Sequence, residues 1–312
     1  MILTLTPNPS LDLLFEAESL RWNDANRLEA PRRRPGGQGI NVVRAARALG
    51  GDARAVAPLG GRTGRELEED LRREGVSLRA VPIAGETRIF VGVHAAAEGR
   101  DLLLNPRGPV LSEEEGERLL ATTLEEIDRA KPAWVACCGS ICRGLPDDLY
   151  ARVGRYARER GALFIPDCDV PALQLAAAAG CDLLVPNVYE AGRLLGRDIA
   201  RPADAIQAAP ALLQFGAKVG VITLDAEGAV AADASGVWTA RPPRLDRRLA
   251  VGAGDALLAG LILALLRGAP TPDALRAGVA AGTASLLSRG DALVHPEDVA
   301  SIEPEVVVSR VA

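Results

Sequence analysis

The feature that most constrains the fold is an alternation of short apolar runs with longer segments of helical periodicity. The apolar runs are typical of strands, and the segments between them carry the 3.6-residue period of helices. Apolar strands separated by helices predict an α/β protein with a mostly parallel sheet, flanked by helices on both faces. The expected strands are residues 2–6, 53–58, 133–138, 163–167, 183–186 and 219–224, and the expected helices are 40–49, 64–74, 112–130, 147–160, 170–179 and 202–215.

Two regions interrupt this alternation. Residues 13–31 are polar and are expected to be irregular, whereas 88–104 has the pattern of a hairpin that turns at Glu98-Gly99-Arg100. Together they are expected to form a small sheet outside the main one, suited to act as a lid. No linker divides the chain, so we expect a single domain, 1–312, with a lid formed by about 13–35 and 86–105.

Charge and hydropathy exclude several classes of function. The chain has 36 basic and 41 acidic residues, a net charge of −5 with no basic block, which argues against a nucleic-acid partner. The longest strongly apolar run, 256–266, is shorter than the ~20 residues of a membrane span, and residues 1–6 do not have the pattern of a secretory signal. Five cysteines, an odd number, indicate reduced thiols and a cytoplasmic location.

A glycine-rich turn, Val251-Gly252-Ala253-Gly254-Asp255, leads directly into an apolar segment. Glycines let a backbone turn tightly and approach a ligand. A helix that starts at Asp255 would leave its first N–H groups unpaired at the positive end of the helix dipole, which is an anion site. Asp255 either caps this helix or accepts a proton from a hydroxyl that attacks a phosphate held by the N–H groups.

A second glycine-rich turn, Gly37-Gln38-Gly39, opens the helix that contains Asn41. It is not a dinucleotide fingerprint, because we expect no strand immediately before it. The turn either packs closely against its helix or lets a sugar pass over bare backbone, with the Asn41 amide facing it. Asp12, which follows the first expected strand, is either a turn former or an acceptor for sugar hydroxyls.

Polar residues also follow two later strands. Asn187 and Glu190 either cap a helix or orient a hydrated Mg²⁺, which needs few protein carboxylates. Residues 223–229 form a simple hairpin or cover a nucleotide. Lys131 and Lys218 are the only lysines and neither lies in a glycine-rich loop, which excludes a P-loop.

These residues together resemble the ribokinase-like carbohydrate kinases, specifically the phosphofructokinase B branch. The similar motifs occur in order along the chain: Thr6-Pro7-Asn8-Pro9-Ser10-Leu11-Asp12, Gly36-Gly37-Gln38-Gly39-Ile40-Asn41-Val42, Thr87-Arg88, Gly139-Ser140, Pro186-Asn187-x-x-Glu190 and Val251-Gly252-Ala253-Gly254-Asp255-Ala256. The resemblance implies a ribokinase-like fold with a small β lid, and ATP- and Mg²⁺-dependent phosphorylation of a sugar hydroxyl. The branch commonly takes fructose 6-phosphate, fructose 1-phosphate or tagatose 6-phosphate.

The resemblance also implies residue roles and a homodimer formed through the lid. By this resemblance, Asp255 is the catalytic base, and the anion hole is formed by Gly252, Ala253 and Gly254. The substrate is bound by Asp12, Gly37, Gln38, Asn41, Arg88 and Ser140. The nucleotide is bound by Asn187, Thr223, Asp225, Gly228 and Gly254, and the metal is held through water by Glu190 and Asn187.

Four places depart from the family pattern, and one of them is Ile141-Cys142-Arg143, which follows Ser140 where a leucine–proline stretch is usual. Gln38 stands where many members have lysine or glycine, Asp225 where a glycine is usual, and Val185 where a lysine often precedes Pro-Asn. At Gln38 a missing positive charge would have to come from another residue, and the candidates are Arg32, Arg33, Arg34 and Arg107. A kinase for an unphosphorylated sugar or nucleoside, and a catalytically silent sugar-phosphate-binding protein, stay open as alternatives.

Overall fold

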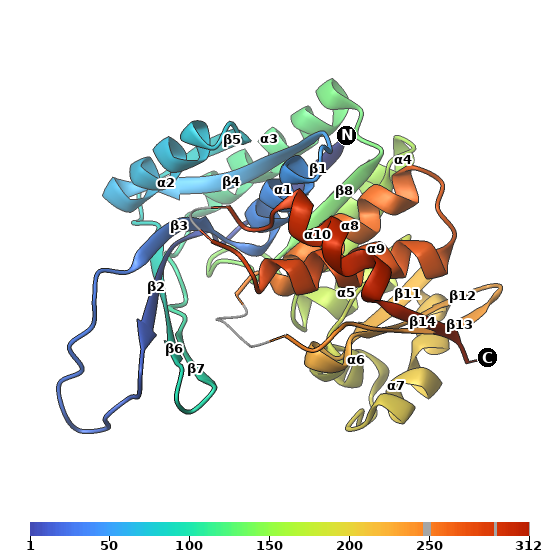
Figure 1. Ribbon diagram of the computed structural model, residues 1–312. Coiled ribbons are helices and arrows are strands. Elements are labelled where there is room, and N and C mark those ends of the chain that lie inside the picture. Colours follow the sequence, from blue (N-terminus) through green and yellow to red (C-terminus); the bar gives the residue numbers. More distant parts are fainter. Residues whose placement is uncertain (246–250, 290–291, 312) are drawn as a thin grey trace.

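The computed structural model describes residues 1–245, 251–289 and 292–311. A parallel sheet in the order β5-β4-β1-β8-β9 forms the centre of the main body (Figure 1). Its strands are β1 (Ile2–Leu5), β4 (Ala53–Gly60), β5 (Ser77–Ile83), β8 (Trp134–Cys138) and β9 (Leu163–Asp167). The sequence predicted four of them. It missed β5, where Arg79 and Pro82 interrupt the apolar pattern.

A second sheet, β10-β11-β12-β13-β14, continues from the first. The two meet where the Asp182 N–H donates to the Phe164 carbonyl at 2.9 Å. The pair β10–β11 is parallel and the pairs beyond it are antiparallel, so the predicted mostly parallel sheet ends in an antiparallel edge. The strands are β10 (Leu183–Leu184), β11 (Val219–Thr223), β12 (Ala229–Asp233), β13 (Gly236–Arg241) and β14 (Val307–Arg310).

Helices cover both faces of the main sheet. Successive side chains along a strand point to opposite faces, and each face packs in its own core. In β8, Trp134 and Ala136 pack in the core that contains α1, α8 and α9, whereas Val135 and Cys137 pack in the core that contains α3 and α4. The helices are α1 (Gln38–Ala48), α2 (Gly61–Arg73), α3 (Glu113–Ala130), α4 (Leu149–Glu159), α5 (Ala172–Ala178), α6 (Val188–Leu195), α7 (Pro202–Ala208), α8 (Ala253–Leu266), α9 (Thr271–Ser285) and α10 (Pro296–Ile302). Within the described residues, none is long and apolar enough to cross a membrane.

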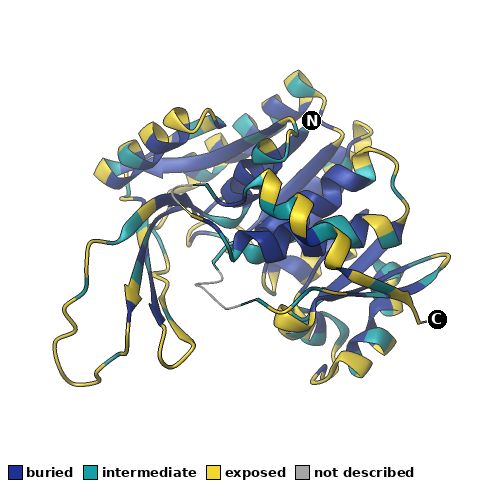
Figure 2. Cartoon of the chain, in the orientation of Figure 1, coloured by how far each residue is buried: buried dark blue, intermediate teal, exposed yellow. Residues whose placement is uncertain are grey.

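A four-stranded sheet, β3-β2-β6-β7, stands apart from the main body (Figure 1). We call it the lid sheet; its strands are β2 (Ser10–Ala17), β3 (Arg32–Gly36), β6 (Arg88–Ala95) and β7 (Arg100–Leu104). The β2–β6 pair is parallel and the two outer pairs are antiparallel. Figure 2 shows that the loops at the end of this sheet are exposed, whereas the inner strands β1, β4 and β8 of the main sheet are largely buried.

The structure confirms the hairpin predicted at 88–104, which forms β6 and β7. The prediction of an irregular segment at 13–31 was wrong for its first five residues, because these lie in β2 and pair with β6, and Leu13 and Leu14 also pair with β3. The expectation that no strand precedes the second glycine turn was also wrong. That strand, β3, consists largely of arginines, so its sequence has no apolar alternation, and its partner β2 holds it in place.

Several predicted element boundaries also differ from the structure, including those of two helices. The helix predicted over 202–215 ends at Ala208 and continues as a 3₁₀ helix, Ala209–Phe215, because Pro210 cannot donate a helical hydrogen bond. Helix α8 begins at Ala253, two residues before the predicted start at Asp255.

Candidate active site

The turn before α8 has the geometry of an anion site. Gly252 is the N-cap, with a left-handed φ of 89°, and no side chain of the described residues caps the helix. The first N–H groups of α8 therefore have no intrahelical acceptor. Among the described residues, a side chain added at Gly254 would meet nothing within 4 Å, so these residues leave the approach to the turn open. The structure thus supports the glycine turn as a place where backbone N–H groups can hold an anion.

Asp255 is the third residue of α8 and is only 6% exposed. Its Oδ2 accepts a hydrogen bond of 2.9 Å from the Asn41 amide. Because Gly252 occupies the cap position, the interpretation of Asp255 as an N-cap residue is wrong. Burial disfavours the charged form and raises the pKa of Asp255 to about 7. A carboxyl group with this pKa can accept and release a proton near neutral pH.

Asn41 is held in place by a chain of polar contacts behind the site. Arg44 donates to Asn41 Oδ1 at 3.4 Å and to the Pro35 carbonyl at 3.1 Å. The same guanidinium binds both carboxylate oxygens of Glu74, at 2.6 and 2.9 Å. With its oxygen facing Arg44, the Asn41 amide directs its N–H₂ group at Asp255.

The second glycine turn lies against the loop after β1. Gly37 has a φ of 110°, and a side chain there would meet Pro9 Cα at 3.0 Å. At Gly36 a side chain would overlap the carboxylate of Asp12. Both glycines are therefore required by close approach of backbone and side chains.

Asp12 lies in β2 and is 2% exposed, so it is a strand residue and the turn-former interpretation is wrong. Ser10 donates to its Oδ1 at 2.6 Å, and burial raises the pKa of its carboxyl group. Arg34 lies directly opposite in β3 and donates to the Val251 carbonyl at 2.7 Å. Arg34 thus connects the lid sheet to the glycine turn of α8.

Arg88 and Ser140 are brought together by Asn8. Arg88 donates to the Asn8 carbonyl at 2.9 Å, and the Asn8 side chain donates to Ser140 Oγ at 2.9 Å. Further donors of Arg88 bind Asn105 and the Pro106 carbonyl. Within the described part of the chain, Asn8 Oδ1 and Arg88 Nε are buried without a hydrogen-bond partner, which leaves polar groups for a ligand.

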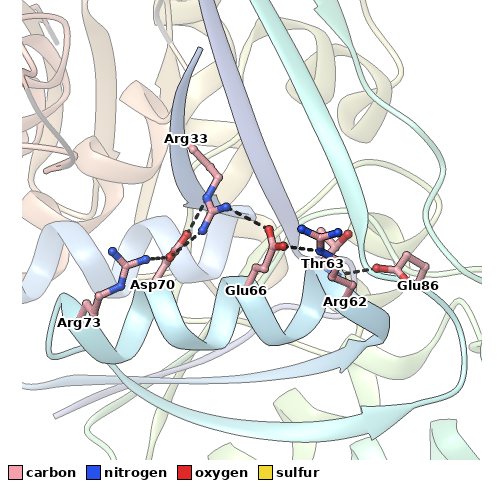
Figure 3. Close-up of polar contacts among 7 residues, drawn as sticks. All are labelled: Arg33, Arg62, Thr63, Glu66, Asp70, Arg73 and Glu86. Carbon is pink, nitrogen blue, oxygen red and sulfur yellow. Dashed lines mark hydrogen bonds and ion pairs between the residues drawn. The ribbon is translucent and has the colours of Figure 1, made fainter. Parts of the chain in front are cut away.

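Gln38 extends over the loop after β8, where its Oε1 would lie 3.2 Å from a side chain placed at Gly139. It therefore lies beside the residue that precedes Ser140. Of the four arginines considered as a source of charge, Arg33 turns away from the site and binds Glu66 and Asp70 of α2 (Figure 3).

The other three arginines differ in whether they reach the site. Arg32 binds the Ser288 carbonyl at 3.4 Å, and the contact of Arg107 is made by its backbone carbonyl, which accepts from Asn8. Among the contacts described, Arg34 is therefore the candidate that reaches the glycine turn of α8.

Of the predicted nucleotide residues, Asn187, Thr223, Asp225 and Gly228 lie along the second sheet, and Gly254 lies in α8. Asn187 and Glu190 form a complete capping box at the start of α6, with both bonds at 2.9 Å, and Asn187 pairs with Thr223 through a parallel bridge. The segment after β11 is a hairpin, as one interpretation had it. Asp225 adopts a left-handed φ of 50°, a conformation that aspartate tolerates better than most residues and that glycine adopts freely.

Sequence reasoning missed three residues of the site. Asn8 belongs to a motif in which the sequence indicates no role for it, and Arg34 is one of four arginines that the sequence does not distinguish. Asp167 at the end of β9 was missed entirely; burial raises its pKa well above the usual range, and the charges of Asp255 and Glu190 raise it further. An aspartate at the carboxyl end of a parallel strand was the available signal, since such strand ends bind ligands.

A model of the pfkB family of carbohydrate kinases matches residues 10–298. The chain belongs to this family. The ATP-dependent 6-phosphofructokinase isozyme 2 of Escherichia coli K12 is 34% identical over 303 residues, which cover 96% of this chain and 97% of that protein. The 1-phosphofructokinase of Bacillus subtilis is 30% identical over 312 residues, which cover 99% and 100%.

Solved structures agree with the sequence comparison. The structure of E. coli phosphofructokinase-2 in complex with substrates and products is similar with a TM-score of 0.90 at 32% identity, covering 97% of this chain and 98% of that one. The resemblance and the ribokinase-like α/β fold predicted from the sequence are thereby confirmed. The protein is a carbohydrate kinase, a phosphotransferase with an alcohol group as acceptor.

Proposed function

We propose that this kinase transfers a phosphoryl group from ATP to a hydroxyl of a sugar phosphate, in the class of fructose 6-phosphate, fructose 1-phosphate or tagatose 6-phosphate. The observation that carries the proposal is the buried Asp255, with a pKa of about 7, beside the unpaired N–H groups of the glycine turn. The relatives named 6-phosphofructokinase and 1-phosphofructokinase support the substrate class.

Asp255 is the proposed base. It accepts the proton of the attacking hydroxyl, while the N–H groups of Gly252, Ala253 and Gly254 stabilise the charge on the transferring phosphoryl group. Phosphoryl transfer needs little covalent chemistry from the protein, so positioning and electrostatics account for most of the rate. Asn41 holds the Asp255 carboxylate in place.

The sugar is proposed to lie between the lid sheet and α1. Asp12, with its buried carboxyl, accepts hydrogen bonds from sugar hydroxyls, and Gly37 and Asn41 complete that side. Gln38 reaches toward the loop of Ser140 and contributes to substrate choice. Closure of the lid would exclude water and limit ATP hydrolysis.

Arg88 and Ser140 are proposed to bind the phosphate that the substrate already carries. The buried Nε of Arg88, which has no hydrogen-bond partner among the residues that the structure describes, leaves a donor for this anion. The hydrogen bonds from Arg88 and Asn8 orient the two groups before substrate arrives. Such preorganisation favours a phosphorylated sugar over a neutral one.

Asn187, Thr223, Asp225 and Gly228 are proposed to border the nucleotide, with Gly254 at its phosphates. The Glu190 carboxylate suits a hydrated Mg²⁺ better than a directly bound one, because it already accepts a hydrogen bond from the Asn187 N–H. Among the described residues, no three acidic, histidine or cysteine groups converge as direct ligands. Glu190 and Asn187 would hold the ion through its waters. When bound, Mg²⁺ supplies positive charge to the ATP phosphates.

The lid sheet is also proposed to pair two subunits in a homodimer. Its two faces differ, because Asp12, Arg34 and Arg88 lie on one, while Ile89 and Leu104 lie on the other and are exposed. An exposed apolar face of this kind marks a protein interface. A cytoplasmic location agrees with five cysteines that are buried and free.

The direct test is ADP formation from MgATP with a panel of acceptors: the three sugar phosphates, free fructose, ribose and adenosine. The proposal predicts the highest kcat/KM for one of the sugar phosphates. A higher kcat/KM for an unphosphorylated acceptor would make the protein a sugar or nucleoside kinase. Binding of a sugar phosphate without turnover would make it a silent binding protein.

A further inference from the structure

Arg34 is a buried cation between the lid sheet and α8. It is 7% exposed and faces Asp12 across the β2–β3 pair. Its Nη2 donates to the Val251 carbonyl at 2.7 Å, and within the described part of the chain its buried Nε has no hydrogen-bond partner. An unsatisfied buried donor is costly to a fold. Packing alone therefore does not explain why an arginine is buried at this position.

The turn held by Arg34 is the one against which Asp255 lies. Val251 is bonded to Gly252, and a side chain at Gly252 would come within 3.7 Å of Asp255 Oδ2 and 3.5 Å of Asn41 Nδ2. The guanidinium and the carboxylate therefore flank the same short piece of backbone. Arg34 contacts the turn from the lid side, and Asn41 contacts Asp255 from α1.

The charges around Asp255 come from several elements. Asp12 in β2 opposes its ionisation, and Asn41 in α1 donates a hydrogen bond to it. Asp167 in β9 lies within its electrostatic reach, because the charge of Asp255 raises the pKa of Asp167. The buried thiol of Cys138 in β8 also lies within its electrostatic reach. In the described part of the chain, Arg34 in β3 is the cation that favours the carboxylate form.

We propose that Arg34 is a positioning residue that clamps the glycine turn through the Val251 carbonyl and keeps Asp255 in its charged form. The part of this that concerns catalysis rests on the proposed function, in which Asp255 is the base. A protonated carboxyl cannot accept the hydroxyl proton, so the charge of Arg34 extends activity to lower pH. The contact also makes the position of the turn depend on the position of the lid strand β3.

The test compares Arg34→Met, Arg34→Gln and Arg34→Lys with the wild type. Arg34→Met removes charge and donor, Arg34→Gln retains a donor, and Arg34→Lys retains the charge. Arg33→Gln is the matched control, because Arg33 is the adjacent residue of β3 and binds α2 on the opposite face. If Arg34→Met does not fold, Arg34→Gln carries the test.

The first readout needs no substrate. Carboxyl ¹³C NMR of aspartate-labelled protein, with the Asp255 signal assigned from Asp255→Asn, gives the pKa of Asp255 directly. An opposite charge at close range shifts a pKa by about one unit or more. We expect an upward shift of about one unit in Arg34→Met and Arg34→Gln, and little change in Arg34→Lys or Arg33→Gln. An unchanged pKa in both uncharged variants would overturn the proposal.

The second readout is the pH profile of kcat/KM, which reports the pKa values of the acid and base groups of the free enzyme. A shift of one unit from about 7 lowers the charged fraction of Asp255 about fivefold at pH 7 and by about a tenth at pH 9. We therefore expect the loss in Arg34→Gln to be larger at pH 7 than at pH 9. An equal loss at every pH would reduce Arg34 to a packing role.

The two readouts separate the two proposals. If the wild type phosphorylates no sugar phosphate, the proposed function fails, and the NMR titration still decides whether Arg34 controls the ionisation of Asp255.

Discussion

Asp255 occupies a position where burial opposes its charge, and this has a consequence for stability. Its pKa in the folded protein, about 7, lies above the ordinary value of 3.8. A raised pKa of this kind contributes stability at low pH that is lost as the pH rises through about 7. Asp255→Asn cannot ionise and does not suffer this loss, while its side chain can still accept from Asn41.

We therefore expect Asp255→Asn to melt close to the wild type at pH 4 and at a higher temperature at pH 8. Thermal unfolding followed by circular dichroism across this range measures the difference. A variant that melts below the wild type at pH 8 would show that the carboxylate is stabilised by its surroundings.

Arg88 is the residue whose removal should distinguish the two substrate classes. A hydrogen bond to a charged group contributes ~1.5–3 kcal/mol, so Arg88→Ala should raise the KM for the sugar phosphate by roughly one to two decades. The KM for ATP should barely move. Steady-state kinetics with each substrate varied in turn measures both constants.

Arg33→Ala is the control for this variant, because Arg33 lies on the other face of the lid sheet. Its kinetic constants should match those of the wild type. If Arg88→Ala leaves the KM for every sugar phosphate unchanged, the phosphate subsite is not at Arg88.

Helices α3 and α6 begin with the same device, a complete capping box, and only α6 lies at the proposed nucleotide site. Loss of an N-cap side chain costs ~1 kcal/mol of stability, so Asn187→Ala and Ser112→Ala should lose similar amounts in urea unfolding. Only Asn187→Ala should also raise the KM for ATP. An unchanged KM for ATP in Asn187→Ala would show that Asn187 caps the helix and does not bind the nucleotide.

The strands and helices of the main body could be predicted because their signal is local. Apolar residues at a period of two or 3.6 fix which face is buried, and the structure confirms most of these elements. The lid was harder to predict, since β3 is formed by Arg32, Arg33 and Arg34 and owes its conformation to pairing with β2. Strand pairing between distant segments overrides such a local pattern.

The candidate site was predictable where a motif marked it, as at Asn41 and Asp255, which the structure joins by a hydrogen bond. Arg34 has no comparable signal, because its place depends on contacts across the fold. Arg34 reaches residue 251 from residue 34, and no spacing along the chain indicates that contact.

The lid sheet determines how two copies of the chain are expected to associate. Leu104 in β7 is 52% exposed on the apolar face of the lid sheet, and Val307 in β14 is 64% exposed on the second sheet. Leu104→Asp should weaken or abolish the dimer, whereas Val307→Asp should leave it intact. Sedimentation velocity measures the assembly; a dimer that survives Leu104→Asp would place the interface elsewhere.

The central claim, that the chain phosphorylates a sugar phosphate with Asp255 as the base, is tested most directly by following both products of one reaction. ³¹P NMR and an ADP assay are run together on the best acceptor of the panel, with the wild type and Asp255→Asn. We expect a new phosphomonoester signal equal in amount to ADP, and a kcat lower by ~10²–10⁴ in Asp255→Asn. ADP accompanied only by inorganic phosphate, or a wild-type kcat in Asp255→Asn, would contradict the claim.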